Sequence, residues 1–222
     1  MNDKDLKKYC SCVSEVIARR LTLYLRCFIQ LKEEGYEYVS SKELAERFNL
    51  NSDLIRKDFS YFGTFGKRGV GYNVDEIIER IKIILGLNQV YKVAIAGAGN
   101  LGKALADYPR FNEGAFKVVA LFDSNARKVG RKYGNNEIPI YHVRELASKV
   151  RELEVDMGII AVPAKAAQQV ADEFVKAGVK GIMNFAPARV SLPQNVKSVC
   201  ADFRAQLEML AYYVSNLNKQ SE

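Results

Sequence analysis

YKVAIAGAGNLGKAL, residues 91–105, is the stretch that decides the fold. An apolar run leads into the triplet Gly97-x-Gly99-x-x-Gly102, and a helix-forming segment follows at once. The first glycine permits a tight turn, the second lets the backbone approach a pyrophosphate, and the third lets helix pack on strand. The helix then presents free N–H groups and its positive dipole end to the phosphates. The segment predicts a dinucleotide-binding loop made of Gly97, Ala98, Gly99, Asn100, Leu101 and Gly102.

A second apolar run ends in Asp123, twenty-one residues beyond Gly102. An acid at this place accepts hydrogen bonds from the adenosine ribose. Because a carboxylate repels a 2′-phosphate, Asp123 predicts NAD(H) rather than NADP(H) as the cofactor. Arg127 and Lys128 follow closely, and we interpret them as solvated helix charges, with contact to a phosphate as the alternative.

The rest of the second half alternates strand and helix. Its strands are apolar throughout, which favours a parallel sheet covered on both faces. The fold class we expect is α/β, with a Rossmann-type parallel sheet domain at residues 87–201 and a C-terminal helix in 202–222. We predict strands at 92–96, 117–122, 156–162, 180–185 and 196–200, and helices at 100–108, 142–152, 164–177 and 202–214.

The first half differs in character and predicts a helix-turn-helix within a DNA-binding domain, residues 1–86. Apolar residues recur at helical spacing over 13–34. Ser40 and Glu43 form a capping-box pattern that opens a short helix ending at Phe48. Asn51 or Ser52 then caps a third helix, 53–62, so that the helix-turn-helix spans about 23–62. A connecting helix follows at 75–87.

Between the third helix and the connecting helix, four glycines occur within nine residues, interleaved with aromatic residues. This composition suits a β-hairpin, and we predict a basic wing at 63–72 with Lys67 and Arg68 at its tip. These two cations suit phosphates or the minor groove.

The third helix carries residues of the types that contact DNA. Arg56 and Lys57 lie near its start, where a recognition helix reaches base edges and an arginine can clamp a guanine. The alternative is that these cations only solubilise a small helical domain. The predicted DNA-binding residues are Ser52, Arg56, Lys57, Ser60, Tyr61, Lys67 and Arg68.

Composition sets limits on the function. The chain has 222 residues and a net charge of +7, but residues 1–90 carry 15 Lys or Arg against 13 Asp or Glu, so charge alone does not identify a DNA-binding half. The chain lacks a signal-peptide core and an apolar run long enough to span a membrane, so we expect a cytoplasmic protein without membrane contact. The spacing of its four cysteines fits no zinc or redox motif, and we predict free thiols and no metal.

Three segments resemble the Rex family of redox-sensing transcriptional repressors: IRKDFSYFGTFGKRGVGY (55–72), GAGNLGKALADYPRF (97–111) and GIMNFAP (181–187). The likeness runs from about Arg20 to Tyr212. It implies a winged-helix domain joined to a Rossmann domain that senses the NADH to NAD+ ratio, with NAD+ permitting operator binding and NADH releasing the protein. It also implies a homodimer whose C-terminal helix is exchanged between subunits. Two recognition helices in a symmetric dimer predict a pseudo-palindromic double-stranded site.

The resemblance further implies a redox switch made of Arg26, Tyr108 and the partner subunit's Asp202. A carboxylate beside the nicotinamide is held by the charged, oxidised ring and freed when the ring is reduced. Phe203 would then pack on the reduced ring. Without the family, Asp202 is most simply the N-cap of the last helix, and Tyr108 is most simply a core residue.

An enzyme is the competing hypothesis, namely an NAD-dependent dehydrogenase with an N-terminal helical domain. Val162 and Pro163 close a strand where they would touch the nicotinamide side, or simply form a turn. The only histidine, His142, has no partner pattern around it, and a surface or capping role is the simpler interpretation. We therefore predict a sensor with no catalytic residues. A structural nucleoid-type binder is a weaker reading, which the intact glycines and Asp123 oppose.

Overall fold

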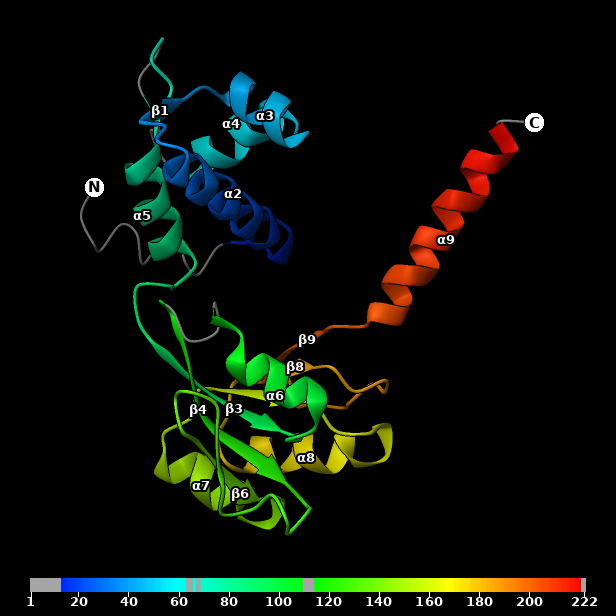
Figure 1. Ribbon diagram of the computed structural model, residues 1–222. Coiled ribbons are helices and arrows are strands. Elements are labelled where there is room, and N and C mark those ends of the chain that lie inside the picture. The colour runs from blue at the N-terminus through cyan, green and yellow to red at the C-terminus, as the bar shows by residue number, and fades with distance from the viewer. Residues whose placement is uncertain (1–12, 63–65, 67–68, 110–113, 221–222) are drawn as a thin grey trace. The chain divides into compact units, whose positions relative to one another are not determined.

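The computed structural model describes residues 13–62, 66, 69–109 and 114–220 (Figure 1). The chain divides into two compact units, Met1–Gln89 and Val90–Glu222. Each has its own buried core.

The described part of the N-terminal unit is a helical bundle with one short antiparallel sheet. Phe28, Leu31, Ile55 and Phe59 are almost fully buried at its centre. Its helices are α2 (Glu15–Glu33), α3 (Ser41–Phe48), α4 (Ser52–Tyr61) and α5 (Val74–Ile84), and its strands are β1 (Tyr38–Val39) and β2 (Tyr72–Asn73). The three helices of the predicted helix-turn-helix, about 23–62, are present as α2, α3 and α4.

Side-chain caps explain where α3 and α4 begin. The Glu43 amide donates to Ser40 Oγ at 3.1 Å, and the Ser40 amide donates to Glu43 Oε2 at 2.8 Å, so the predicted capping box is present. Asn49 then takes the left-handed conformation and ends α3. Asn51 Oδ1 accepts from the amides of Asp53 and Leu54, so the cap of α4 is Asn51 and Ser52 is its first helical residue.

The glycine-rich segment pairs with a strand that the sequence analysis missed. β2 pairs with β1, which precedes the helix-turn-helix, with Val39 opposite Tyr72. Gly71 makes this approach possible, because a Cβ there would lie 2.6 Å from the Val39 carbonyl oxygen. Residues 63–65, Lys67 and Arg68 lie outside the described residues, so the predicted hairpin tip is among them.

Within the described residues, the C-terminal unit is built on a seven-stranded sheet in the order β5-β6-β4-β3-β7-β8-β9. All neighbours are parallel except β5 and β6. From β6 to β9 this is the Rossmann order 3-2-1-4-5-6, which confirms the predicted fold class. The strands are β3 (Tyr91–Ala96), β4 (Phe116–Asp123), β5 (Lys132–Tyr133), β6 (Ile138–His142), β7 (Met157–Ile160), β8 (Gly181–Asn184) and β9 (Lys197–Cys200).

Helices cover both faces of the sheet (Figure 1). One core lies on the side of α6 and includes Ile95, Ala106 and Leu121, and the other lies on the side of α7 and α8 and includes Leu146 and Phe174. The helices are α6 (Asn100–Asp107), η2 (Val143–Glu145), α7 (Leu146–Glu152), α8 (Ala164–Lys176) and α9 (Phe203–Gln220).

The prediction of a helix over 142–152 is wrong at its start. Residues 138–142 form β6, a strand missed because Pro139 argues against one. Pro139 is tolerated because β6 pairs there with only the two-residue strand β5. His142 ends β6, and its Nδ1 accepts from the Arg144 amide at 3.1 Å, which is the capping role considered for it.

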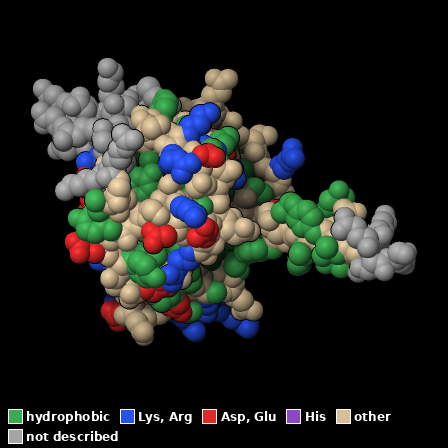
Figure 2. Space-filling view, turned by 90° about the horizontal axis from the view of Figure 1, so that it is seen from above, with side chains coloured by type: hydrophobic (Ala, Val, Ile, Leu, Met, Phe, Trp, Pro, Cys, Tyr) green, Lys and Arg blue, Asp and Glu red, His purple; other side chains and the backbone are tan. Residues whose placement is uncertain are grey.

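The last helix is longer than the expected 202–214 and buries little of its apolar surface. Figure 2 shows hydrophobic side chains gathered on its surface. Phe203, Leu207, Leu210, Tyr212 and Leu217 are each more than half exposed. Within the described residues, no helix is long and apolar enough to cross a membrane. In the same part of the chain, Cys27 and Cys200 are free thiols and no cluster of metal-ligating side chains occurs.

Candidate functional site

The glycine loop joins β3 to α6, and each of its three glycines has a different physical reason. Gly97 has φ +107°, and a Cβ there would collide with the Ala161 carbonyl group. A Cβ on Gly102 would collide with the Gly97 carbonyl oxygen. Gly99 faces open space, with no heavy atom of the described structure within 4 Å of a built Cβ. Two glycines therefore serve the packing, and Gly99 leaves room for a ligand.

A cavity of about 740 Å³ opens at the carboxyl ends of β3, β4 and β7. Ligands of open α/β sheets bind at such strand ends, where the strand order reverses. The cavity brings together five predicted residues that are far apart in the sequence, namely Gly97, Gly99, Asp123, Val162 and Pro163. Ala98 reaches the same place through its amide. The described residues that line this cavity do not include the predicted Asn100, Leu101, Gly102, Tyr108 and Phe203.

Asp123 is held by donors from three sides. The Ala98 amide donates to Oδ2 at 3.0 Å, the Asn125 amide donates to Oδ1 at 2.8 Å, and Lys128 Nζ donates to Oδ2 at 2.8 Å. Burial raises the pKa of Asp123, but the hydrogen bonds from Lys128 and the two amides outweigh it and bring the pKa below its ordinary value. The carboxylate is therefore ionised beside the loop.

The interpretation of Lys128 as a solvated helix charge is wrong. Residues 126–130 form turns rather than a helix. Lys128 lines the cavity and pairs with Asp123, and one third of its side chain is exposed. The sequence did not lead to this pair because the alternative considered for Lys128 was contact with a phosphate. The spacing of Asp123 and Lys128 could have indicated the pair, because a turn brings together residues five positions apart.

Other residues that line the cavity were not predicted, because the sequence does not show which side of η2 and α8 faces the strand ends. Arg144 lies on η2, and Gln169 and Glu173 lie one turn apart on α8. The position of α8 directly after Pro163 was the only available signal. The cavity thus offers Arg144 and Lys128 as cations and Asp123 and Glu173 as acids.

The proposed switch residues are distributed over both units. Arg26 is exposed on α2 of the N-terminal unit. Tyr108 ends α6 and is 46% exposed, so the alternative of a core tyrosine is wrong. Asp202 Oδ1 accepts from the Ala205 amide at 3.1 Å and caps α9, as the simpler interpretation had it. Phe203 packs on Phe185 of the GIMNFAP segment, with ring centroids 6.0 Å apart.

Five of the seven predicted DNA-binding residues lie on α4, namely Ser52, Arg56, Lys57, Ser60 and Tyr61. Arg56 is about half exposed; its Nη1 donates to Ser41 Oγ on α3 at 3.0 Å, and it pairs with Asp53. Lys57 and Tyr61 are exposed, and Ser60 Oγ donates to the Lys57 carbonyl oxygen at 2.8 Å. Polar and cationic groups on the exposed face of the second helix of a helix-turn-helix are suited to a DNA groove.

Comparison with known proteins agrees with both halves of the chain. A family profile described as "Putative DNA-binding protein N-terminus" matches residues 12–60, and one described as "CoA binding domain" matches residues 88–188. The redox-sensing transcriptional repressor Rex 1 of Thermotoga maritima is 41% identical over 206 residues, which cover 93% of this chain and 98% of that relative. Rex of Chloroflexus aurantiacus is 44% identical over 202 residues, 90% of this chain and 94% of its own.

Solved structures match along the same length. The crystal structure of RSP in complex with β-NAD+ and operator DNA has a TM-score of 0.87 at 33% identity and covers 94% of this chain and 95% of that chain. The structure of RSP with β-NADH has a TM-score of 0.84 at 32% identity and covers 95% of this chain and 99% of that one.

Fold and site together define a two-domain DNA-binding regulator, in which a helix-turn-helix unit precedes a Rossmann-type nucleotide-binding unit. The chain belongs to the Rex family of redox-sensing transcriptional repressors. Members of this family are repressors and not enzymes, so the alternative of an NAD-dependent dehydrogenase is excluded.

Proposed function

We propose that this protein binds operator DNA through α4 and leaves it when NADH replaces NAD+. The observation that carries the proposal is the cavity at the strand ends, where the open space at Gly99 and the ionised Asp123 meet in a chain that also carries a helix-turn-helix. The Rex relatives support it, as do the structures of RSP in complex with NAD+ and operator DNA and in complex with NADH. We assign residues 1–86 to DNA, 87–201 to the cofactor and 202–222 to dimerisation.

The residues present suit a dinucleotide. Gly97, Gly99 and Gly102 let the backbone pass close to a pyrophosphate, and the start of α6 directs free amides at it. Asp123 Oδ1 keeps a lone pair for a ribose hydroxyl, since it accepts from the Asn125 amide, whereas Oδ2 already accepts from both the Ala98 amide and Lys128. Val162 and Pro163 close the cavity at the end of β7. The nicotinamide supplies a positive charge in its oxidised form and none in its reduced form.

The proposed switch would respond to this difference in charge between the oxidised and the reduced nicotinamide. We propose that Tyr108 and the partner subunit's Asp202 face the nicotinamide, with Phe203 packing on the reduced ring. A carboxylate no longer held by a charged ring is available to Arg26 on α2. Tyr108 is accessible for such a role because of its exposure at the end of α6. The N-terminal cap that Asp202 now provides is compatible with a second contact, because only Oδ1 accepts from the Ala205 amide.

The working form we propose is a homodimer that exchanges α9. Its apolar side chains need a cover, and burying them would contribute about 25 cal/mol per Å². Two symmetric copies of α4 then require a pseudo-palindromic site. We expect the dimer to act in the cytoplasm, without a metal and without membrane contact.

The test is a gel-shift titration with a duplex selected by the protein from random sequences in the presence of NAD+. We expect NADH to weaken binding about 5–150-fold, which corresponds to a coupling of about 1–3 kcal/mol, and NAD+ to leave the complex intact. Arg56→Ala should weaken the selected duplex more than a random one, because a base contact is lost. Equal affinity with either cofactor would contradict the proposed sensor, and equal losses on both duplexes would contradict the role of Arg56.

A further inference from the structure

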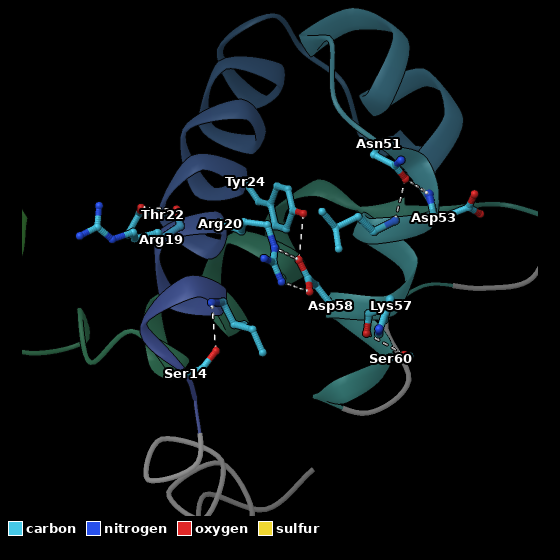
Figure 3. Close-up of polar contacts among 12 residues, drawn as sticks. Ser14, Arg19, Arg20, Thr22, Tyr24, Asn51, Asp53, Lys57, Asp58 and Ser60 are labelled. Atoms are coloured by element: carbon cyan, nitrogen blue, oxygen red, sulfur yellow. Dashed lines mark hydrogen bonds and ion pairs between the residues drawn. The ribbon is translucent and has the colours of Figure 1, made fainter. Parts of the chain in front are cut away.

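A buried carboxylate joins the recognition helix α4 to α2 (Figure 3). Arg20 Nε donates to Asp58 Oδ2 at 2.6 Å, and Arg20 Nη2 donates to Oδ1 at 2.7 Å. The Tyr24 hydroxyl donates to Oδ2 at 3.0 Å. All three donors come from α2, and the acceptor lies 34 and 38 residues further along the chain.

The contact is inside the unit rather than on its surface. The side chain of Asp58 is 4% exposed and that of Arg20 is 26% exposed. The hydrogen bond to Asp58 raises the pKa of Arg20, and burial together with the same carboxylate raises the pKa of Tyr24. The arginine is therefore charged, and the tyrosine keeps the proton that it donates.

The apolar neighbours of Asp58 do not by themselves fix the rotation of α4. Phe59, the next residue, has ring centroids 5.5 Å from Tyr24, 6.1 Å from Phe28 and 5.0 Å from Tyr72. These ring pairs favour edge-to-face geometry but tolerate centroid separations over a range of about 4.5–7 Å, so they hold α4 less narrowly than a hydrogen-bonded pair does. A two-pronged arginine–carboxylate pair is directional, because both hydrogen bonds must lie in one plane. The network therefore restrains the orientation of α4 more narrowly than the aromatic contacts do.

The orientation matters because Asp58 adjoins the residues that face outward. Figure 3 shows Asp58 directed at Arg20 and Tyr24, while Lys57 and Ser60 lie on other faces of α4. Successive residues are about 100° apart around a helix. A rotation of α4 that moves Asp58 therefore moves Arg56 and Lys57 by the same angle.

We propose that Arg20, Tyr24 and Asp58 are positioning residues for DNA recognition, which fix the rotation of α4 against α2 and thereby aim Arg56 and Lys57. The inference rests on the proposed function, because it takes α4 as the element that meets DNA. The network contributes geometry rather than net stability, since buried ion pairs often exchange for apolar pairs without loss of stability.

Replacing the ion pair by apolar residues therefore tests the proposal. In the full-length chain, Arg20→Met and Asp58→Leu are combined and compared with the parent by urea denaturation and by titration with the selected duplex and a random duplex. We expect the double variant to stay folded, with any loss of stability limited to that of the unpaired Tyr24 hydroxyl, at least tenfold weaker binding to the selected duplex, and a smaller ratio of selected to random affinity. A parent-like NADH titration reports that the cofactor unit is intact.

The matched control is the Glu15–Arg19 pair on the same helix, which is more than 70% exposed and whose Arg19 points away from α4 (Figure 3). Glu15→Leu with Arg19→Met should retain the parent's duplex preference. Should the Arg20/Asp58 double variant fold poorly, Tyr24→Phe removes a single hydrogen bond and should still lower the selected-to-random ratio about threefold.

A stable double variant with the parent's affinity and preference overturns the inference, as does a Tyr24→Phe chain with an unchanged ratio. The proposed function fails separately. A parent that binds the selected duplex but ignores NADH contradicts redox sensing and leaves the positioning result valid. A parent that prefers no duplex at all overturns both.

Discussion

Asp58 and Asp123 are both ion-paired carboxylates with several donors, yet they lie in different settings. Every side-chain donor to Asp58 comes from α2, and the carboxylate is closed off at 4% exposure. The donors to Asp123 are two amides and Lys128, and the carboxylate, 12% exposed, opens onto a cavity of about 740 Å³. The protein itself surrounds the Asp58 carboxylate with donors, whereas the Asp123 carboxylate borders space that a ligand can occupy.

An aspartate can therefore either fix the packing of two helices or remain accessible to a ligand, depending on where its donors lie. A carboxylate whose donors sit on a packed neighbouring helix fixes a geometry, because no donor can leave without disturbing the core. A carboxylate held by a loop and a turn remains ionised and accessible, which suits exchange with ribose hydroxyls.

The largest expected effect comes from truncating Asp58, with the same truncation of Asp123 as its counterpart. Asp58→Ala should lower the free energy of unfolding of the N-terminal unit by about 3–5 kcal/mol, because it strands Arg20 and leaves the buried Tyr24 hydroxyl unpaired. Asp123→Ala should cost about 1 kcal/mol, since water can reach its donors. Hydrogen exchange of α4 and β4 amides in urea measures both. Comparable losses in the two units would contradict the difference between a packed Asp58 and an accessible Asp123.

Within the cofactor site, Gly102 and Gly99 form a second pair of positions, one closed by packing and one open. Gly102→Ala should destabilise the C-terminal unit by about 2–3 kcal/mol, because its Cβ meets the Gly97 carbonyl oxygen. Gly99→Ala, the matched control, should cost less than about 1 kcal/mol, since its Cβ meets open space.

NADH affinity should nevertheless fall in both variants, because Gly99 is the residue that keeps backbone exposed to the pyrophosphate. Calorimetric titration and urea denaturation separate the two effects. A Gly99→Ala chain with the parent's NADH affinity would show that this glycine does not border the cofactor.

The smallest effect concerns acid. The folded pKa of Asp123 lies below its ordinary value of 3.8, so its contribution to stability is complete above that value and is lost as the pH falls through the folded pKa. Below about pH 4 the stability of the C-terminal unit should therefore fall more steeply in the parent than in Asp123→Asn. Urea midpoints between pH 3 and 6 measure the difference. Parallel curves would indicate that Asp123 has the same pKa folded and unfolded.

Local chemistry made much of the fold predictable. The glycine triplet, the capping box of Ser40 and Glu43, and the apolar strands each carry their structural reason within a few neighbouring residues. Strand-end residues could also be gathered into one site, because parallel strands end together.

What escaped prediction depends on partners distant in sequence or on exceptions to local rules. β1 is two residues long and is defined only by its pairing with β2. β6 was not predicted because its Pro139 argues against a strand. The ion pair between Arg20 and Asp58 joins residues that are 38 positions apart, and no periodic pattern in the sequence marks it. The packing of α2 on α4 is what reveals it.

The uncovered apolar surface of α9 has a consequence for the amount of protein a cell must hold. Eight large apolar side chains of this helix are at least 48% exposed in the single chain. If a second copy covers them, mass action makes the stability of each chain depend on its own concentration. Dilution would then weaken folding and operator occupancy together. The helix would set a minimum copy number, below which a repressor of this design has no working form.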